Sequence, residues 1–202
     1  MGTIAIVDYG VGNLKSVSNA MNFVGCSTKI TGDAAELERA DAILLPGVGA
    51  FPDAADKLRE QGLDQVLIRQ AEQKPILGIC LGMQLLFDTG FEVRQSAGLG
   101  LVKGKADKII TGQKLPHIGW NSLRFPKESP LFQGFSGGEY VYFVHSYCGY
   151  VAQEEDAAAY TDYGVPVLAA VQRGNVFGCQ FHPEKSGEVG LQILQHFGEL
   201  SK

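Results

Sequence analysis

The pattern of hydrophobic positions gives the two halves of the chain different characters. In the first half, runs of consecutive apolar residues alternate with segments whose apolar residues recur every three or four positions. The runs predict strands buried on both faces, and the recurrence predicts helices packed by one face. Strands are expected at residues 3–8, 27–31, 42–45 and 76–79, and helices at 14–24, at 53–73 with a break near Gly62, and at 81–87.

The second half is a succession of strand-like segments that ends in one amphipathic helix. Strands are expected at residues 102–110, 122–125, 140–147, 157–161, 167–172 and 176–181, and a helix at 187–200. Arg173-Gly174-Asn175 suits a tight hairpin between the last two strands. We therefore predict a single α/β domain over residues 1–202. It would be an open, mostly parallel sheet with helices on both faces and an antiparallel extension in the second half.

Composition and charge narrow the class of protein. Hydrophobic residues make up 45% of the chain, and a formal net charge of −5 comes without a basic stripe, so we expect no nucleic-acid partner. The chain enters its first strand without a basic leader, and no apolar stretch is long enough to span a bilayer. Four cysteines lack the spacing of a disulfide framework. We therefore expect a cytoplasmic protein that does not bind membranes.

The segment around Cys80 carries the most specific chemical signal. Gly78 and Gly82 flank Cys80 at two residues on each side, between an apolar strand and a helix. This is the nucleophile-elbow pattern with cysteine in place of serine. The turn would put the sulfur at a helix N-terminus, which favours thiolate, and would leave the Leu81 N–H free to face an oxyanion. On this pattern alone, a buried structural cysteine is an equally good interpretation.

His182 is the histidine with a carboxylate at a useful spacing, because Glu184 follows it by two residues. Pro183 favours an extended His182, and alternate residues of an extended chain project to the same side. Glu184 can therefore fix the tautomer of the imidazole and support the imidazolium. The apolar strand before His182 would deliver it to the carboxyl edge of the sheet, where Cys80 also emerges.

A candidate oxyanion loop, Pro46-Gly47-Val48-Gly49, follows the third expected strand. Two glycines around one residue allow a backbone that presents N–H groups to an anion. A proline–glycine pair more often marks a simple turn. After a buried strand, in a chain that also has an elbow cysteine and a His-x-Glu pair, the oxyanion function becomes the better interpretation.

Gly78-Ile79-Cys80-Leu81-Gly82-Met83-Gln84, together with Phe181-His182-Pro183-Glu184, resembles the class I (triad) glutamine amidotransferases. These enzymes hydrolyse the side-chain amide of glutamine and hand ammonia to a synthase. The resemblance covers almost the whole chain and implies their α/β fold, with no cofactor and no metal. It implies that Cys80 attacks the amide to form a glutamyl thioester. His182 would then act as base and acid, and Glu184 would orient it.

The resemblance also assigns positions outside the triad. It implies oxyanion donors at Gly47, Val48 and Leu81. It implies contacts with glutamine from Gln84, His145, Ser146 and Tyr147. Residues 8–14, 116–121 and 142–147 further resemble glutaminase subunits that form a heterodimer with a separate (β/α)₈-barrel cyclase. Positions that would face this partner are Asn13, Trp120, Tyr142 and Lys185.

Other functions leave weaker signals in the residues. His145-x-x-Cys148 and Cys179-x-x-His182 form a nominal Cys₂His₂ set, but residues three apart on a strand point to opposite faces, so we expect no zinc. Gly10-x-Gly12 hints at a dinucleotide loop, yet the third glycine is missing.

Three further alternatives share the elbow pattern. They are a non-catalytic binding subunit with this fold, the glutaminase subunit of a different amidotransferase complex, and a cysteine hydrolase of the esterase type. An acid two residues after the histidine favours an amidotransferase over an esterase. No P-loop and no synthase domain is evident, so the ammonia acceptor is expected on another polypeptide.

Overall fold

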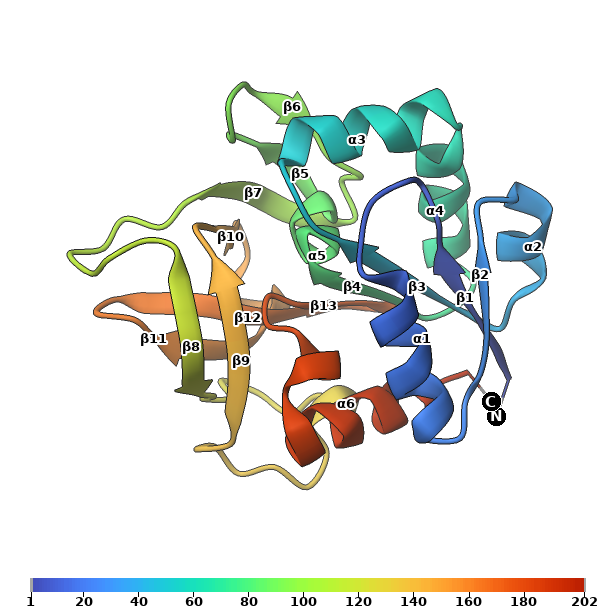
Figure 1. Cartoon of the computed structure of the whole chain (residues 1–202). Helices are drawn as coiled ribbons and strands as arrows, with labels where there is room; N and C mark the ends of the chain where they lie inside the picture. The colour runs from blue at the N-terminus through green and yellow to red at the C-terminus, as the bar shows by residue number, and fades with distance from the viewer. Residues whose placement is uncertain (1, 202) are drawn as a thin grey trace.

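The computed structural model describes residues 2–201, and its centre is a seven-stranded sheet with the order β11-β12-β13-β4-β3-β1-β2 (Figure 1). These strands are β1 (Thr3–Val7), β2 (Ser27–Thr31), β3 (Ala42–Gly47), β4 (Ile76–Cys80), β11 (Ala157–Asp162), β12 (Pro166–Arg173) and β13 (Val176–Cys179). From β13 to β2 all neighbours pair in parallel, whereas β11–β12 and β12–β13 pair antiparallel. The predicted fold class is confirmed.

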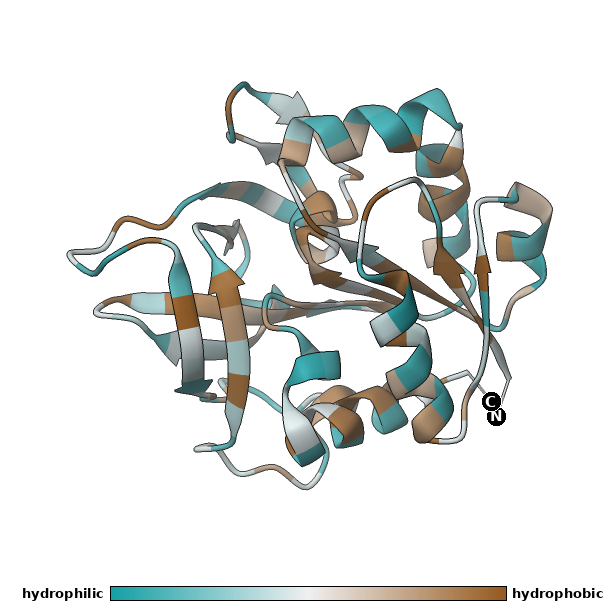
Figure 2. Ribbon diagram, viewed as in Figure 1, coloured by the Kyte–Doolittle hydropathy of each residue, from teal (hydrophilic) through white to brown (hydrophobic). Residues whose placement is uncertain are grey.

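Helices cover both faces of this sheet (Figure 1). One group is α2 (Ala34–Arg39), α3 (Phe51–Glu60) and α4 (Leu63–Ala71), and the other is α1 (Leu14–Phe23) and α6 (Gly187–Glu199). Neighbouring residues of β3 alternate between two cores, since Ile43 packs with the first group and Leu44 with the second. This explains why the central strands are apolar at successive positions, while the helices carry hydrophilic and hydrophobic residues side by side (Figure 2).

The second half adds two smaller sheets. A four-stranded sheet has the order β10-β7-β5-β6, built from β5 (Phe87–Gly90), β6 (Ser96–Ala97), β7 (Val102–Lys108) and β10 (Tyr147–Val151). A two-stranded sheet pairs β8 (His117–Ser122) with β9 (Tyr140–His145). The expected strand 140–147 is therefore divided at Ser146, and its two parts pair with different partners. Short 3₁₀ segments lie at η1 (Pro130–Phe132), η2 (Glu154–Asp156) and η3 (Pro183–Lys185).

Two local predictions are corrected by the structure. The helix expected at residues 81–87 is only α5 (Leu81–Leu85), because the chain enters β5 at Phe87. A run of apolar residues does not distinguish a buried helix from a buried strand. The strand expected at 122–125 lies earlier, at His117–Ser122, and Arg124 makes only an isolated bridge to Tyr160.

Helix α2 was missed, although its start has a recognisable signal. The Asp33 side chain accepts a hydrogen bond from the Glu36 N–H at 3.0 Å. An acidic N-cap followed three residues later by glutamate is close to a capping box. At six residues, α2 offers too little apolar periodicity to reveal itself.

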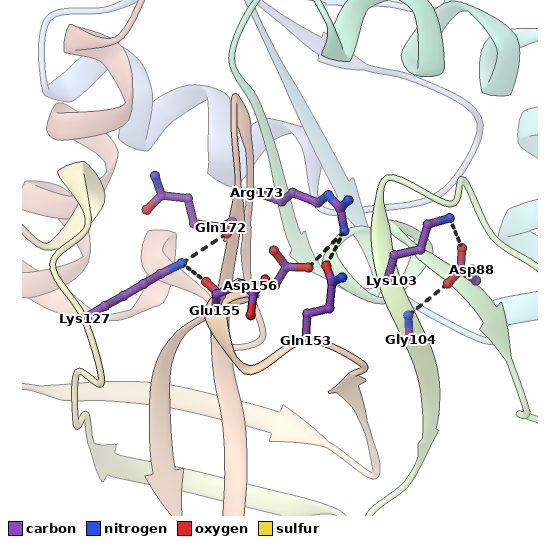
Figure 3. Close-up of polar contacts among 9 residues, drawn as sticks. All are labelled: Asp88, Lys103, Gly104, Lys127, Gln153, Glu155, Asp156, Gln172 and Arg173. Carbon is purple, nitrogen blue, oxygen red and sulfur yellow. Dashed lines mark hydrogen bonds and ion pairs between the residues drawn. The ribbon is translucent and has the colours of Figure 1, made fainter.

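A polar network ties irregular segments to the antiparallel edge of the main sheet (Figure 3). Arg173 on β12 donates to the buried Asp156 carboxylate at 3.3 Å and to Gln153 Oε1 at 3.0 Å. Lys127 donates to the carbonyl of Glu155. None of these residues lines the cavity at Cys80, so we assign the network a structural function. Within residues 2–201, no helix is long and apolar enough to cross a membrane.

Candidate active site

Cys80 lies at the end of β4 in a strained backbone conformation, with φ of 55° and ψ of −111°. A Cβ atom at Gly78 would lie 2.6 Å from the carbonyl oxygen of Gly82, and one at Gly82 would lie 1.8 Å from the carbonyl oxygen of Leu45. Only glycine fits at these two positions. The backbone therefore has the sharp strand-to-helix turn that the flanking glycines indicated, and the turn holds the cysteine side chain at the edge of the sheet.

The imidazole of His182 lies against a buried carboxylate. His182 Nδ1 and Glu184 Oε1 are 2.8 Å apart, with side chains 4% and 1% exposed. The backbone of His182 is also fixed, because its N–H donates to the Tyr142 carbonyl at 3.0 Å and its carbonyl accepts from Ser186 Oγ at 2.7 Å. With Nδ1 held by Glu184, the other ring nitrogen is the one available for proton transfer.

The charge balance at this pair favours an imidazolium. Burial lowers the pKa of His182, but hydrogen bonds and charge interactions with Cys80 and Glu184 outweigh it and raise the pKa to about 9. At neutral pH the arrangement therefore favours a protonated His182 beside the sulfur. Such a pair can deliver a nucleophile and then protonate a leaving group.

A cavity of about 340 Å³ opens at Cys80 and brings most of the expected site residues together. Its lining includes these members of the predicted set: Val48, Leu81, Gln84, His145, Ser146, Tyr147, His182 and Lys185. Gly47 and Glu184 lie behind this lining. Asn13, Trp120 and Tyr142 do not line the cavity. A volume of this size is suited to a small metabolite.

The candidate oxyanion segment runs directly beside the nucleophile. Gly47 is the register partner of Cys80 across β3 and β4. A Cβ atom at Gly47 would lie 2.8 Å from the hydroxyl of Tyr9, and that hydroxyl donates to the Pro46 carbonyl at 2.9 Å. Gly49 follows with φ of 101°, a conformation that L side chains rarely adopt. Tyr9 thus fixes the first peptide of the segment, between Pro46 and Gly47, and Gly49 gives the end of the segment unusual backbone freedom.

His145 lines the cavity, and His117 lies behind it. His145 Nδ1–H donates to the Tyr147 carbonyl at 2.9 Å, and burial lowers the pKa of His145 to about 4. The ring of His117 is stacked on those of Phe143 and Tyr163. These contacts assign the two histidines a structural function in holding the Tyr147 segment.

Sequence reasoning missed two polar residues of the site. Glu92 lines the cavity, and its Oε2 accepts a hydrogen bond from the Phe51 N–H at 2.8 Å, where α3 begins. Gln180 is fully buried, with its Nε2 3.8 Å from Cys80 Sγ. Gln180 reaches the sulfur because β13 pairs with β4, so no local pattern in the sequence indicated it.

Metal-binding and disulfide chemistry find no support in the described part of the chain. Across residues 2–201, no group of three or more histidine, cysteine, aspartate or glutamate side chains could hold a metal ion. All four cysteines lie in that range, are buried, and form no disulfide there. Burial raises the pKa of Cys148 to about 11 and also raises the pKa of Cys179.

An elbow cysteine beside a histidine–carboxylate pair, at the carboxyl edge of an α/β sheet, defines a cysteine-dependent hydrolase or acyltransferase. Residues 5–199 match the model of the family described as glutamine amidotransferase class-I, and the chain belongs to this family. The family that the motifs indicated is thereby confirmed.

Several curated relatives that match the chain carry the name "Imidazole glycerol phosphate synthase subunit HisH". The protein of that name from Caldanaerobacter subterraneus subsp. tengcongensis is 50% identical, over 98% of each chain. The one from Moorella thermoacetica is 48% identical, over 99% of this chain and 96% of its own.

Solved structures with lower identity share the fold. A chain of "Structure of PurLQS from Thermotoga maritima" matches with a TM-score of 0.81 and 23% identity, over 100% of both chains. A putative GMP synthase component from Thermoplasma acidophilum matches with a TM-score of 0.77 and 21% identity, over 100% of this chain and 94% of its own.

Proposed function

We propose that this chain is the glutaminase subunit of an imidazole glycerol phosphate synthase, acting in the cytoplasm in histidine biosynthesis. It would release ammonia from glutamine and pass it to a (β/α)₈-barrel cyclase subunit that makes imidazole glycerol phosphate and aminoimidazole carboxamide ribotide. The observation that carries the proposal is the convergence of Cys80 and the His182–Glu184 pair on one cavity. The extensive identity with proteins named as this subunit supports the choice among amidotransferases.

The proposed reaction proceeds through two tetrahedral intermediates. The Cys80 thiolate attacks the side-chain carbonyl carbon of glutamine, and the oxyanion is stabilised by N–H groups of Leu81 and the Gly47–Val48 segment. His182 donates its proton to the departing nitrogen, which leaves as ammonia. His182 then takes a proton from water as the water attacks the thioester, and glutamate leaves with the sulfur restored as thiolate. Glutamine and water are thereby converted to glutamate and ammonia.

Recognition of glutamine is proposed to involve polar groups around the cavity. Both N–H bonds of the Gln84 amide are committed, to the Tyr147 carbonyl at 2.9 Å and to Gln180 Oε1 at 3.1 Å. The Oε1 atom of Gln84 is therefore the part of its amide that remains available to a ligand. The carboxylate of Glu92 supplies a negative charge on the cavity wall, which suits the ammonium of an amino-acid substrate.

The partner surface is proposed on β8 and β9, which lie side by side with α6 next to β9 (Figure 1). Trp120 is 52% exposed and its ring meets that of Tyr142 at a centroid distance of 5.9 Å. Exposed aromatic side chains of this kind often dominate binding energy at interfaces. Lys185 lies at the cavity, whereas Asn13 caps α1 by accepting from the Ser16 N–H. Among the four expected interface positions, Asn13 therefore has a local structural function as well.

The decisive test is to co-express this chain with a barrel cyclase and to assay glutamine hydrolysis with and without it. We expect a stable heterodimer whose glutaminase rate rises when the cyclase carries its ligand. Trp120→Ala should weaken the heterodimer while leaving the isolated fold intact. Association with a different synthase instead would favour the glutaminase subunit of another complex. No hydrolysis in any complex would favour a non-catalytic subunit.

A further inference from the structure

A buried chain of amides leads from the cavity wall to the nucleophile. Gln180 has no exposed surface, and its backbone N–H donates to the Ala169 carbonyl at 2.8 Å, which holds it beside the end of β13. Its side chain meets Gln84 at one end and Cys80 at the other, at 3.1 Å and 3.8 Å respectively. Gln180 therefore bridges the candidate glutamine-binding amide and the sulfur.

The first acceptor in this row of amides fixes which group donates and which accepts in every hydrogen bond that follows. The Tyr147 carbonyl can only accept, so Gln84 must present its NH₂ group there. The second N–H of that group then points to Gln180, which must offer its oxygen. The Gln180 amide is thereby oriented with its NH₂ group toward Cys80, and reversing it would set two donors against each other.

We propose that Gln180 is a further catalytic residue, whose Nε2–H donates to the Cys80 thiolate and increases the ionised fraction of the nucleophile. This inference rests on the proposed function, in which Cys80 is the nucleophile. An amide N–H gives a stronger hydrogen bond to a charged acceptor than to a neutral one, so the donor favours thiolate over thiol. It also stabilises the thiolate that leaves when the thioester is hydrolysed.

The shortness of α5 increases the value of such a donor. This helix has only five residues, so its macrodipole gives the sulfur less support than a long helix would. Gln180 and His182 both reach the sulfur from the segment that follows β13, and together they place two donors on it. Gln180 supplies its donor without carrying a charge or exchanging a proton.

The test is the pH profile of Cys80 reactivity toward dithiodipyridine in the full chain without glutamine. A hydrogen bond to a charged group is worth at least about tenfold in equilibrium, so Gln180→Leu should move the midpoint up by about one pH unit. A thiolate that forms less readily is a better nucleophile, by about threefold per unit. The variant should therefore react about threefold more slowly at low pH and about threefold faster at high pH. The Cys80→Ser variant measures how fast the other three cysteines react with dithiodipyridine, and this rate is subtracted.

Controls separate this function from a purely structural one. Gln180→Met repeats the test with a flexible side chain, in case leucine disturbs folding. Gln70→Leu removes a buried glutamine on α4, whose Oε1 has no partner within residues 2–201, and should leave the profile unchanged.

The inference is overturned if Gln180→Leu and Gln180→Met both fold and keep the wild-type pH profile of Cys80 reactivity. It is overturned in the same way if that profile is unchanged and only the KM for glutamine rises. That result would make Gln180 a support for Gln84 alone. Failure of the proposed function would look different, because the wild-type chain would then not hydrolyse glutamine with its cyclase.

Discussion

Glu184→Gln offers the sharpest test of how the triad is charged. The pKa of His182 is raised from an ordinary 6.5 to about 9, because burial lowers it but hydrogen bonds and charge interactions with Cys80 and Glu184 outweigh burial. Glu184 raises the His182 pKa less than Cys80 does. Removing the Glu184 charge should therefore lower the His182 pKa by about one unit. The variant amide can still accept from Nδ1, but its NH₂ group replaces a buried oxygen that has no partner within residues 2–201.

The expected kinetic result is a moderate loss and a moved pH profile. In hydrolase triads the orienting acid is worth roughly two orders of magnitude less than the base, so Glu184→Gln should retain more kcat than His182→Ala. Because protonated His182 is the acid for ammonia release, the alkaline limb of kcat should move to lower pH by about one unit.

The assay is glutamate release by the heterodimer, measured from neutral to alkaline pH. Glu188→Gln, which neutralises an exposed carboxylate on α6, is the matched control. An alkaline limb that stays in place, or a kcat below that of His182→Ala, would refute the reasoning.

Three further predictions follow from the site geometry. Cys80→Ala should abolish glutamine hydrolysis with an unchanged circular dichroism spectrum, and labelling of another cysteine by a glutamine-analogue electrophile would contradict this. Gly82→Ala should destabilise the chain by about 1–3 kcal/mol in a urea titration because of the overlap with Leu45, whereas Gly112→Ala, with open space around its Cβ, should not. Gly49→Ala meets no atom within 4 Å but cannot easily hold φ of 101°, so it should reduce stimulation by the liganded cyclase more than basal turnover. Wild-type stimulation in that variant would exclude a switch at this segment.

The parts of the site that sequence could predict are those whose constraints are local. Gly78 and Gly82 surround Cys80 within one turn, and their steric requirement is set by the elbow itself. The short separation of His182 and Glu184 was enough to indicate their contact, although the contact forms through the 3₁₀ segment η3 and not through the extended chain that the alternation assumed. The alternation of apolar strands with helices likewise sets the parallel sheet and the edge at which its ligands bind.

The parts that sequence could not predict depend on how distant segments come together. Gln180 reaches Cys80 because β13 pairs beside β4, with Cys179 opposite Ile79, and no local pattern reveals that neighbour. Glu92 lies in a turn with no periodicity, and reaches the cavity through its contact with the first residue of α3. The error at residues 122–125 has a similar origin, because β8 is held by pairing with β9 and carries few apolar residues.

The same non-local contacts bear on how a partner could act on the chemistry. Tyr9, in the turn before α1, holds the Pro46 carbonyl from one side, while Gly49 stands open on the other. Val48 between them is 46% exposed, so a protein bound there could move this peptide without disturbing the sheet beneath.

The catalytic base, in contrast, is held in place. The backbone N–H of His182 donates to the carbonyl of Tyr142 on β9, and Tyr142 pairs with Trp120 on β8. When a partner binds on β8 and β9, His182 would therefore stay in place, whereas the oxyanion segment could change its conformation. Regulation through that segment requires no movement of the nucleophile, and since one oxyanion donor is worth about a hundredfold in rate, the reorientation of a single peptide would be enough.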